Sequence, residues 1–220
     1  MALIVKICGV NATEPADAAV RAGADFVGLV FHPKSPRHLA FDAARVLAEH
    51  LRGRVRLVAL VADADDSWLA AAVEAVRPDF LQLHGRETPE RAAAIKARFA
   101  TPLIKAFPIA GAEDFAAVAR YDDIADIFLF DAKAPEGLRP GGHGTAFDWQ
   151  LLQGRRFVRP WLLAGGLQPE NVARAVISSG APGVDVSSGV ETAPGIKSAS
   201  LIVDFVFAAR NHLTHSEAHL

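Results

Sequence analysis

Residues 161–191, WLLAGGLQPENVARAVISSGAPGVDVSSGVE, contain one full unit of the pattern that decides the fold of this chain. An apolar run at 161–165 precedes a helical pattern at 169–180, and a second apolar run follows at 183–187. These runs lack the polar alternation of half-exposed strands, which is typical of parallel strands covered on both faces. The segment therefore predicts a strand, a helix and a parallel strand in succession.

The same succession extends along the whole chain. Eight apolar runs are strand candidates, at 3–8, 25–31, 55–61, 79–84, 102–107, 126–131, 161–165 and 183–187. Alanine-rich helical patterns alternate with them, at 15–23, 41–51, 67–76, 89–99, 112–119, 169–180 and 196–210. Eight such units predict a single-domain α/β protein, a (β/α)8 TIM barrel over residues 1–210. An open doubly wound sheet is the alternative, but no G-x-G-x-x-G sequence follows the first strand.

Short signals mark several helix ends. A polar residue, a proline and an acid stand together at 13–17, 88–90 and 168–170, a pattern that favours a helix start. Gly23 and Gly180 follow helical patterns, where a left-handed residue often ends a helix. The polar residues 211–220 are expected to form a flexible C-terminal tail.

Composition excludes several classes of function. The chain has 23 Lys and Arg against 25 Asp and Glu, so it lacks the basic excess that nucleic acids or anionic membranes attract. A single cysteine, Cys8, excludes an internal disulfide and cysteine-rich zinc clusters, and favours a reducing compartment. Lys6 interrupts the apolar start, and no run reaches the ~18 residues of a spanning helix. We therefore expect a cytoplasmic protein.

Histidine spacing gives little support to a metal site. His212 and His215 are three residues apart and could in principle share a metal, but a frayed terminus explains them better. The other histidines show no paired metal-ligand spacing. No metal is predicted.

Glycine-rich segments stand at the ends of the last three strands, at 132–147, 164–166 and 185–191. Glycine lets backbone N–H groups approach a phosphate closely, and phosphate sites after strands seven and eight recur in this fold. The alternative is that the glycines serve tight turns. The segments after the seventh and eighth strands are therefore predicted to bind a phosphate, and the loop after the sixth strand could fold over it.

Cys8 and Asp131 end strands one and six, where active sites of this fold are built. A lone cysteine is often a small buried residue, but a nearby cation such as Lys6 would favour its thiolate. Asp131 follows the four apolar residues 127–130, and its plainer interpretation is a cap or a partner of Lys133. Facing each other across a phosphosugar, the two would suit acid–base catalysis.

Two further side chains lie at strand ends. Arg37 closes the proline-stiffened segment FHPKSPR at 31–37, from which it could bind a carboxylate through two hydrogen bonds. Taken alone, it would be a solvated surface arginine. His84 in LQLHG could orient a neighbour or a ligand, or simply end its strand.

These motifs together resemble one enzyme family, phosphoribosylanthranilate isomerase of tryptophan biosynthesis. The resemblance rests on motifs in the family's order, namely KICG (6–9), GADFVGLVFHPKSPR (23–37), LQLHG (81–85), LFDAK (129–133), GGHGTAFDW (141–149), LAGGLQPENV (163–172), GVDVSSGVE (183–191) and PGIK (194–197). It implies an Amadori rearrangement of N-(5-phosphoribosyl)anthranilate to 1-(2-carboxyphenylamino)-1-deoxyribulose 5-phosphate, without metal or organic cofactor.

The resemblance also implies roles for individual residues. Asp131 would be the general acid that protonates the furanose ring oxygen, and Cys8 the general base that takes the C2′ proton. Arg37 would bind the anthranilate carboxylate, and Asp185 would lie near the aminoaldose nitrogen. The phosphate would be held by Gly144, Thr145, Gly165, Gly166, Ser187 and Ser188. The only partner implied is this small phosphosugar, and the chain could be a monomer or a homodimer.

Two alternatives stay open at this point. Another phosphosugar barrel enzyme would share the phosphate loops but not the pair of Cys8 and Asp131. A catalytically inert phosphate-binding protein would bind the product without turnover.

Overall fold

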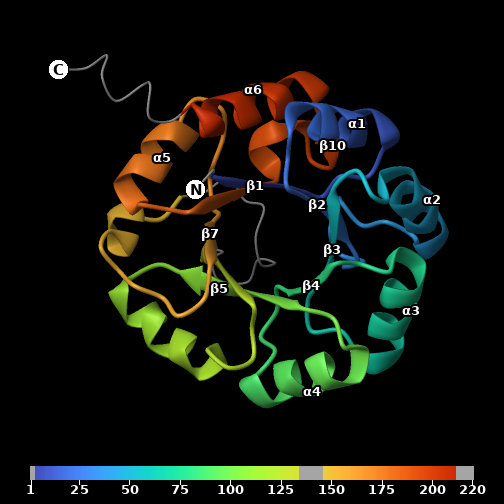
Figure 1. The fold of residues 1–220 in the computed structure, drawn as a ribbon, viewed down its shortest axis with the longest axis horizontal. Helices are drawn as coiled ribbons and strands as arrows, with labels where there is room; N and C mark the ends of the chain where they lie inside the picture. Colours follow the sequence, from blue (N-terminus) through green and yellow to red (C-terminus); the bar gives the residue numbers. More distant parts are fainter. Residues whose placement is uncertain (1–2, 134–145, 212–220) are drawn as a thin grey trace.

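The computed structural model describes residues 3–133 and 146–211, in which eight parallel strands close into a barrel (Figure 1). β8 pairs with β1 and completes the ring, so the predicted (β/α)8 barrel is confirmed and the open sheet is excluded. The strands are β1 (Ile4–Cys8), β2 (Phe26–Val30), β3 (Arg56–Val61), β4 (Phe80–Leu83), β5 (Leu103–Ile109), β6 (Ile127–Ala132), β7 (Trp161–Leu163) and β8 (Gly183–Val186).

Helices surround the barrel (Figure 1). They are α1 (Thr13–Ala22), α2 (Phe41–Leu51), α3 (Asp66–Val76), α4 (Pro89–Phe99), α5 (Val172–Ser179) and α6 (Ala199–Arg210), with 3-10 segments η1 (Ala112–Tyr121), η2 (Trp149–Leu152) and η3 (Ser188–Val190). Within the described residues, no helix is both long and apolar enough to cross a membrane.

Several predicted helix ends are confirmed. The Thr88 hydroxyl accepts a hydrogen bond from the Arg91 N–H and caps α4, whose first residue is Pro89. Gly23 and Gly180 adopt left-handed φ values of 85° and 69° and end α1 and α5.

Three segments differ from the sequence prediction. The helix expected at 112–119 is the 3-10 segment η1, with N–H groups bonded three residues back at both ends. α5 begins at Val172 because 168–171 form a turn in which the Asn171 side chain accepts the Gln168 N–H. The predicted start at 196 is replaced by an antiparallel hairpin of β9 (Glu191–Ala193) and β10 (Ile196–Lys197), after which α6 begins at Ala199.

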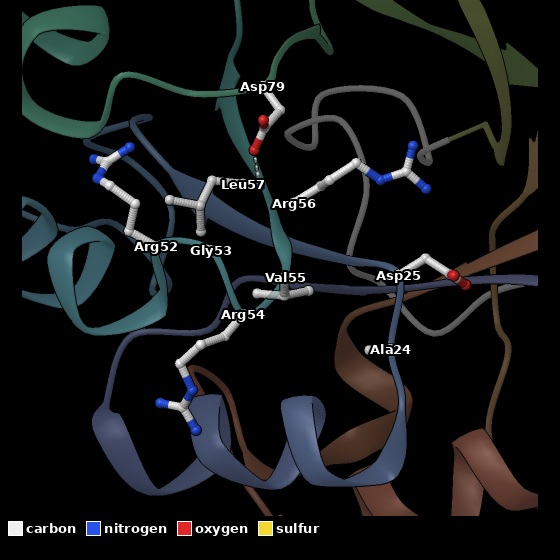
Figure 2. Close-up of a pocket in the computed structure, with 9 residues that line it drawn as sticks. All are labelled: Ala24, Asp25, Arg52, Gly53, Arg54, Val55, Arg56, Leu57 and Asp79. Atoms are coloured by element: carbon white, nitrogen blue, oxygen red, sulfur yellow. Dashed lines mark hydrogen bonds between the residues drawn. The ribbon is translucent and has the colours of Figure 1, made fainter.

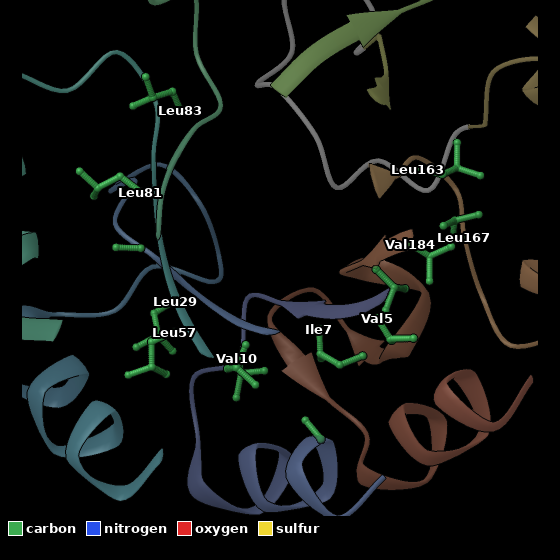
Figure 3. Close-up of a cluster of buried hydrophobic side chains, with 14 of the residues drawn as sticks. Val5, Ile7, Val10, Leu29, Leu57, Leu81, Leu83, Leu163, Leu167 and Val184 are labelled. Carbon is green, nitrogen blue, oxygen red and sulfur yellow. The ribbon is translucent and has the colours of Figure 1, made fainter. Parts of the chain in front are cut away.

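The two larger clusters of buried hydrophobic residues are separated by the wall of the barrel. The larger of the two lies between strands and helices and includes Val5, Ile7 and Leu29 (Figure 3). The smaller of the two fills the inside of the barrel with residues such as Phe26, Val58 and Leu129. Because alternate strand residues share a face, β1 points Val5 and Ile7 outward and the residues between and after them inward.

Candidate active site

Strand alternation points Cys8 into the carboxyl-terminal end of the barrel. It follows Ile4 and Lys6 on the inward face of β1 and packs with Val30 and Leu60. Gly28 of β2 makes room for the thiol, because a Cβ at that position would lie 3.0 Å from the Cys8 sulfur. The cysteine is 4% exposed and is therefore held in a fixed, nearly dry position.

Opposing effects act on the Cys8 thiol. Burial raises its pKa above the ordinary value, while the ammonium groups of Lys6 and Lys197 act in the other direction. The prediction that Lys6 lies near Cys8 is therefore correct, but burial outweighs the two cations. The resting side chain is a neutral thiol.

Lys6 forms a buried ion pair with Asp185. Its Nζ lies 2.8 Å from Oδ1 of Asp185, and the two side chains are 0% and 7% exposed. Burial disfavours the charged lysine, but the carboxylate raises the pKa of Lys6 above its ordinary value. The structure thus brings the predicted site residue Asp185 into the barrel beneath Cys8, since Asp185 of β8 pairs in register with Lys6 of β1.

Asp131 reaches the same end of the barrel from β6. Its side chain is 14% exposed, its Oδ1 accepts the Ala132 N–H at 2.8 Å, and its Oδ2 lies 3.3 Å from Nε2 of His84. The suggested partner Lys133 contacts Asp114 instead, at 3.7 Å. Asp131 therefore faces His84 rather than a lysine.

His84 is oriented from behind by a second side chain. The Gln82 amide nitrogen lies 2.9 Å from Nδ1 of His84. Because an amide nitrogen can only donate, Nδ1 accepts, and the ring proton stands on Nε2, toward Asp131. The sequence left open whether His84 orients a neighbour, and the geometry supports that role with Asp131 as the neighbour.

Gly165 brings the loop after β7 against this carboxylate. Its φ is 88°, and a Cβ there would lie 2.6 Å from the Ala132 nitrogen and 3.1 Å from Oδ1 of Asp131. Gly166 also has a left-handed φ, of 66°. A side chain at Gly165 would thus push on the end of β6 and on Asp131.

The loops after β7 and β8 meet at one glycine. A Cβ on Gly189 would collide with the Leu167 carbonyl, so the loop of Gly165 and Gly166 packs directly on that of Ser187 and Ser188. Four of the predicted phosphate ligands are therefore neighbours. The other two, Gly144 and Thr145, lie outside the described residues.

Arg37 is buried and holds a carboxylate through two hydrogen bonds, as its position predicted, but the carboxylate belongs to the protein. Its Nε and Nη2 donate to the two oxygens of Glu191, each at 2.7 Å. Lys197 donates to Oε1 of the same Glu191, also at 2.7 Å. Glu191 and Lys197 lay within the quoted motifs GVDVSSGVE and PGIK without a role, which was the available signal for them.

A separate cavity of about 390 Å³ lies at the opposite end of the barrel (Figure 2). Its lining residues directly precede β2, β3 and β4 or begin β3, and they include Arg52, Arg54 and Arg56. Figure 2 shows these three arginines pointing in different directions, and the first two pair with Glu49 and Asp17. This cavity is far from Cys8 and Asp131 and is not the candidate active site.

No group of three or more potential metal-binding His, Cys, Asp or Glu side chains occurs in residues 3–133 and 146–211. His212 and His215, whose spacing suggested a metal pair, lie outside the described residues.

Comparison with known proteins places the chain in one family. The sequence model of the family described as N-(5'phosphoribosyl)anthranilate (PRA) isomerase matches residues 5–208. The chain belongs to this family. The resemblance inferred from the motifs is confirmed.

Individual members of the PRA isomerase family are similar over nearly their whole length. N-(5'-phosphoribosyl)anthranilate isomerase of Rhodopseudomonas palustris (strain BisA53) is 55% identical over 211 residues, which cover 96% of this chain and 97% of that protein. The crystal structure of the Thermotoga maritima enzyme has a TM-score of 0.85 and 35% identity, covering 95% of this chain and 99% of the other.

One solved PRA isomerase holds a ligand. It is a complex with reduced 1-(o-carboxyphenylamino)-1-deoxyribulose 5-phosphate, with a TM-score of 0.82, 33% identity and coverage of 95% of this chain and 99% of the other. The ligand combines a phosphate and an aromatic carboxylate, the two anionic groups for which the motifs here predict sites.

Proposed function

We propose that this PRA isomerase converts N-(5'-phosphoribosyl)anthranilate into 1-(2-carboxyphenylamino)-1-deoxyribulose 5-phosphate, with Asp131 as general acid and Cys8 as general base. One observation carries the proposal: Cys8 and Asp131 lie on inward faces of β1 and β6 at the same end of the barrel, with the loops after β7 and β8 between them. An acid and a base on two sides of one bound sugar are what the rearrangement requires.

The first step opens the sugar ring. The protonated Asp131 carboxyl gives its proton to the furanose oxygen, the bond from C1′ to that oxygen breaks, and the anthranilate nitrogen lone pair forms a Schiff base. His84 holds Oδ2 and the Ala132 N–H holds Oδ1, so the carboxyl group keeps one orientation during the transfer.

The second step removes the C2′ proton. The Cys8 thiolate accepts this proton, the freed electron pair forms the C1′–C2′ double bond, and the π pair of the Schiff base returns to the anthranilate nitrogen. The resulting enolamine tautomerises to the ketone. Cys8 then loses this proton to solvent and Asp131 regains one, which restores the acid and the thiolate with which the cycle began. Because the resting side chain is a neutral thiol, only the fraction of enzyme that carries the thiolate can take this step. Lys6 and Lys197 assist by favouring the thiolate against the effect of burial.

The two anionic ends of the substrate fix it between these groups. Backbone N–H groups of Gly165, Gly166, Ser187 and Ser188 would bind the phosphate, in the loops that meet at Gly189. Arg37 would bind the anthranilate carboxylate with the guanidinium N–H groups that do not donate to Glu191. We infer a cytoplasmic location and a monomer or homodimer; cell fractionation and sedimentation test these two points.

The experiment is the loss of fluorescence of freshly made phosphoribosylanthranilate. The wild-type enzyme should consume the substrate and so abolish its fluorescence. Cys8→Ser and Asp131→Asn should fold normally but turn the substrate over at least ~100-fold more slowly. Both variants should still bind the reduced product analogue, because each loses a proton-transfer group rather than an anion ligand. Turnover near the wild-type rate in either variant would overturn that residue's role, and tight product binding with no turnover by wild type would favour the inert binding protein.

A further inference from the structure

Four polar side chains form a connected cluster beside the candidate active site: Arg37, Glu191, Lys197 and Ser187. Arg37 and Lys197 both donate to Glu191, and Lys197 also donates to the backbone oxygen of Ser187 at 2.8 Å and to its hydroxyl at 3.2 Å. The three charged side chains are at most 6% exposed. The cluster thus joins the loop after β2, the loop after β8 and the β9–β10 hairpin.

The charges in this cluster do not cancel. Arg37 and Lys197 share the single carboxylate of Glu191, so one positive charge remains in a place nearly closed to water. Burial disfavours the charged form of Glu191, but Arg37 and Lys197 hold its pKa below its usual range, so the carboxylate is ionised. An excess buried cation is costly unless an anion completes the site.

The cluster also fixes where the arginine points. Glu191 occupies the Nε edge of the Arg37 guanidinium with two short hydrogen bonds. The Arg37 side chain also packs directly against Gly9, where a Cβ would lie only 2.6 Å from Cδ of Arg37. The planar group is therefore set before any ligand arrives, which lowers the entropy cost of binding.

The same cluster reaches the proposed base. The Ser187 hydroxyl, which accepts from Lys197, donates to the Cys8 carbonyl at 3.1 Å. The hairpin thus connects the proposed carboxylate ligand, the loop after β8 and the end of β1 through hydrogen bonds.

We propose that Glu191 and Lys197 are positioning residues of the isomerase, Glu191 by aiming Arg37 and Lys197 by keeping the cluster positively charged for the anionic substrate. This inference rests on the proposed function of Arg37 as the ligand of the anthranilate carboxylate. It assigns the β9–β10 hairpin, which the barrel itself does not require, to substrate binding.

Raising the pH removes the excess positive charge of the cluster without a mutation. Burial lowers the pKa of Lys197 to about 8, against the opposing effects of Glu191 on β9 and Cys8 on β1, while Arg37 after β2 lowers it further. Below that pH the cluster carries its excess positive charge, and above it the cluster is neutral. KM should therefore rise from about pH 7 to about pH 9.

The test compares Lys197→Met, Lys197→Arg, Glu191→Gln and Arg37→Ala with the matched control Lys96→Met. Lys96 pairs with Asp126 at the amino-terminal end of β6, away from the site. The readouts are the calorimetric Kd for reduced 1-(o-carboxyphenylamino)-1-deoxyribulose 5-phosphate, KM and kcat from pH 6.5 to 9.5 (roughly the range around the lysine pKa), and thermal unfolding.

Lys197→Met and Glu191→Gln should weaken binding of the analogue and raise KM at least ~10-fold at pH 7. Glu191→Gln should change kcat less than ~3-fold, whereas Lys197→Met should also lower kcat, because it removes a cation that favours the Cys8 thiolate. Lys197→Met should also lose the rise of KM with pH. Lys197→Arg should bind well and show no rise, because arginine stays charged throughout. The control should behave as wild type in binding and KM.

Wild-type affinity in folded Lys197→Met and Glu191→Gln would overturn the inference. If Lys197→Met does not fold, a wild-type rise of KM with pH in Lys197→Arg would overturn it instead. Arg37→Ala distinguishes a failure of this inference from a failure of the proposed role of Arg37. Weakened binding there with normal Glu191→Gln and Lys197→Met removes only this inference, while normal binding in Arg37→Ala removes the proposed role of Arg37 itself.

Discussion

Gly165 offers a clean test of how the loop after β7 supports Asp131, because the chain contains a matched glycine. Gly165 and Gly23 have nearly the same φ, 88° and 85°. A Cβ at Gly23 would meet nothing within 4 Å, whereas a Cβ at Gly165 would lie 2.6 Å from the Ala132 nitrogen and 2.8 Å from its Cβ. Gly23→Ala therefore measures the backbone cost alone, and Gly165→Ala adds the collision with β6.

The expected magnitudes follow from these two terms. A left-handed alanine costs about 1–2 kcal/mol in either place. Forcing a methyl group against the Ala132 backbone adds about 1–3 kcal/mol, because strand β6 must shift. For a chain of this size, each kcal/mol lowers Tm by about 2–4 °C. Tm should thus fall by about 2–8 °C in Gly23→Ala and by clearly more in Gly165→Ala.

Activity should separate the variants further. The methyl group at Gly165 would stand 3.1 Å from Oδ1 of Asp131, so relief of the collision moves the proposed acid. A displacement near 1 Å can cost on the order of 100-fold in rate, and we expect kcat to fall at least ~10-fold in Gly165→Ala and not in Gly23→Ala. Equal losses of stability in the two variants, together with an unchanged kcat in Gly165→Ala, would refute the reasoning.

Three further outcomes follow from the site. The Cys8 thiol should remain neutral throughout the neutral range, because burial raises its pKa, and the thiolate absorbance of wild type minus Cys8→Ser should appear only above about pH 8.5; a thiolate already formed at about pH 7 would contradict this. Arg37→Ala should mainly raise KM, and an unchanged KM with a collapsed kcat would argue against anchoring. Lys6→Met should lower the free energy of unfolding by about 3–5 kcal/mol in urea titrations, since it strands the buried Asp185 carboxylate, while Arg45→Ala in an exposed pair with Asp42 should change it by less than ~1 kcal/mol.

The barrel could be predicted because its determinants are local. Each strand is an apolar run whose two faces are covered, and helix ends such as Thr88 and Gly180 carry their own signals. The η1 segment was predicted as an α-helix because its apolar spacing does not distinguish hydrogen bonds to the third residue from those to the fourth. The positions of Cys8 and Asp131 followed from the barrel, since both end strands.

The partners of the site residues could not be predicted, because they are distant in the chain. Arg37 and Glu191 are 154 residues apart, and Lys6 and Asp185 are 179 apart. No local pattern states which lysine meets which carboxylate. Arg37 alone is compatible with a surface position, and only the folded barrel places Glu191 and Lys197 beside it.

Two cations from different parts of the chain act on the Cys8 thiol. Lys6 is two residues away on the same face of β1, but its ammonium is held at 2.8 Å by the carboxylate of Asp185, which acts on the thiol in the opposite direction. Lys197 shares its carboxylate with Arg37, so the cluster around it keeps a positive charge. Lys6 nevertheless has the larger effect on the pKa of the Cys8 thiol, and Lys197 adds to it from the β9–β10 hairpin. The hairpin would therefore serve both the binding of the anionic substrate and the base that acts on it.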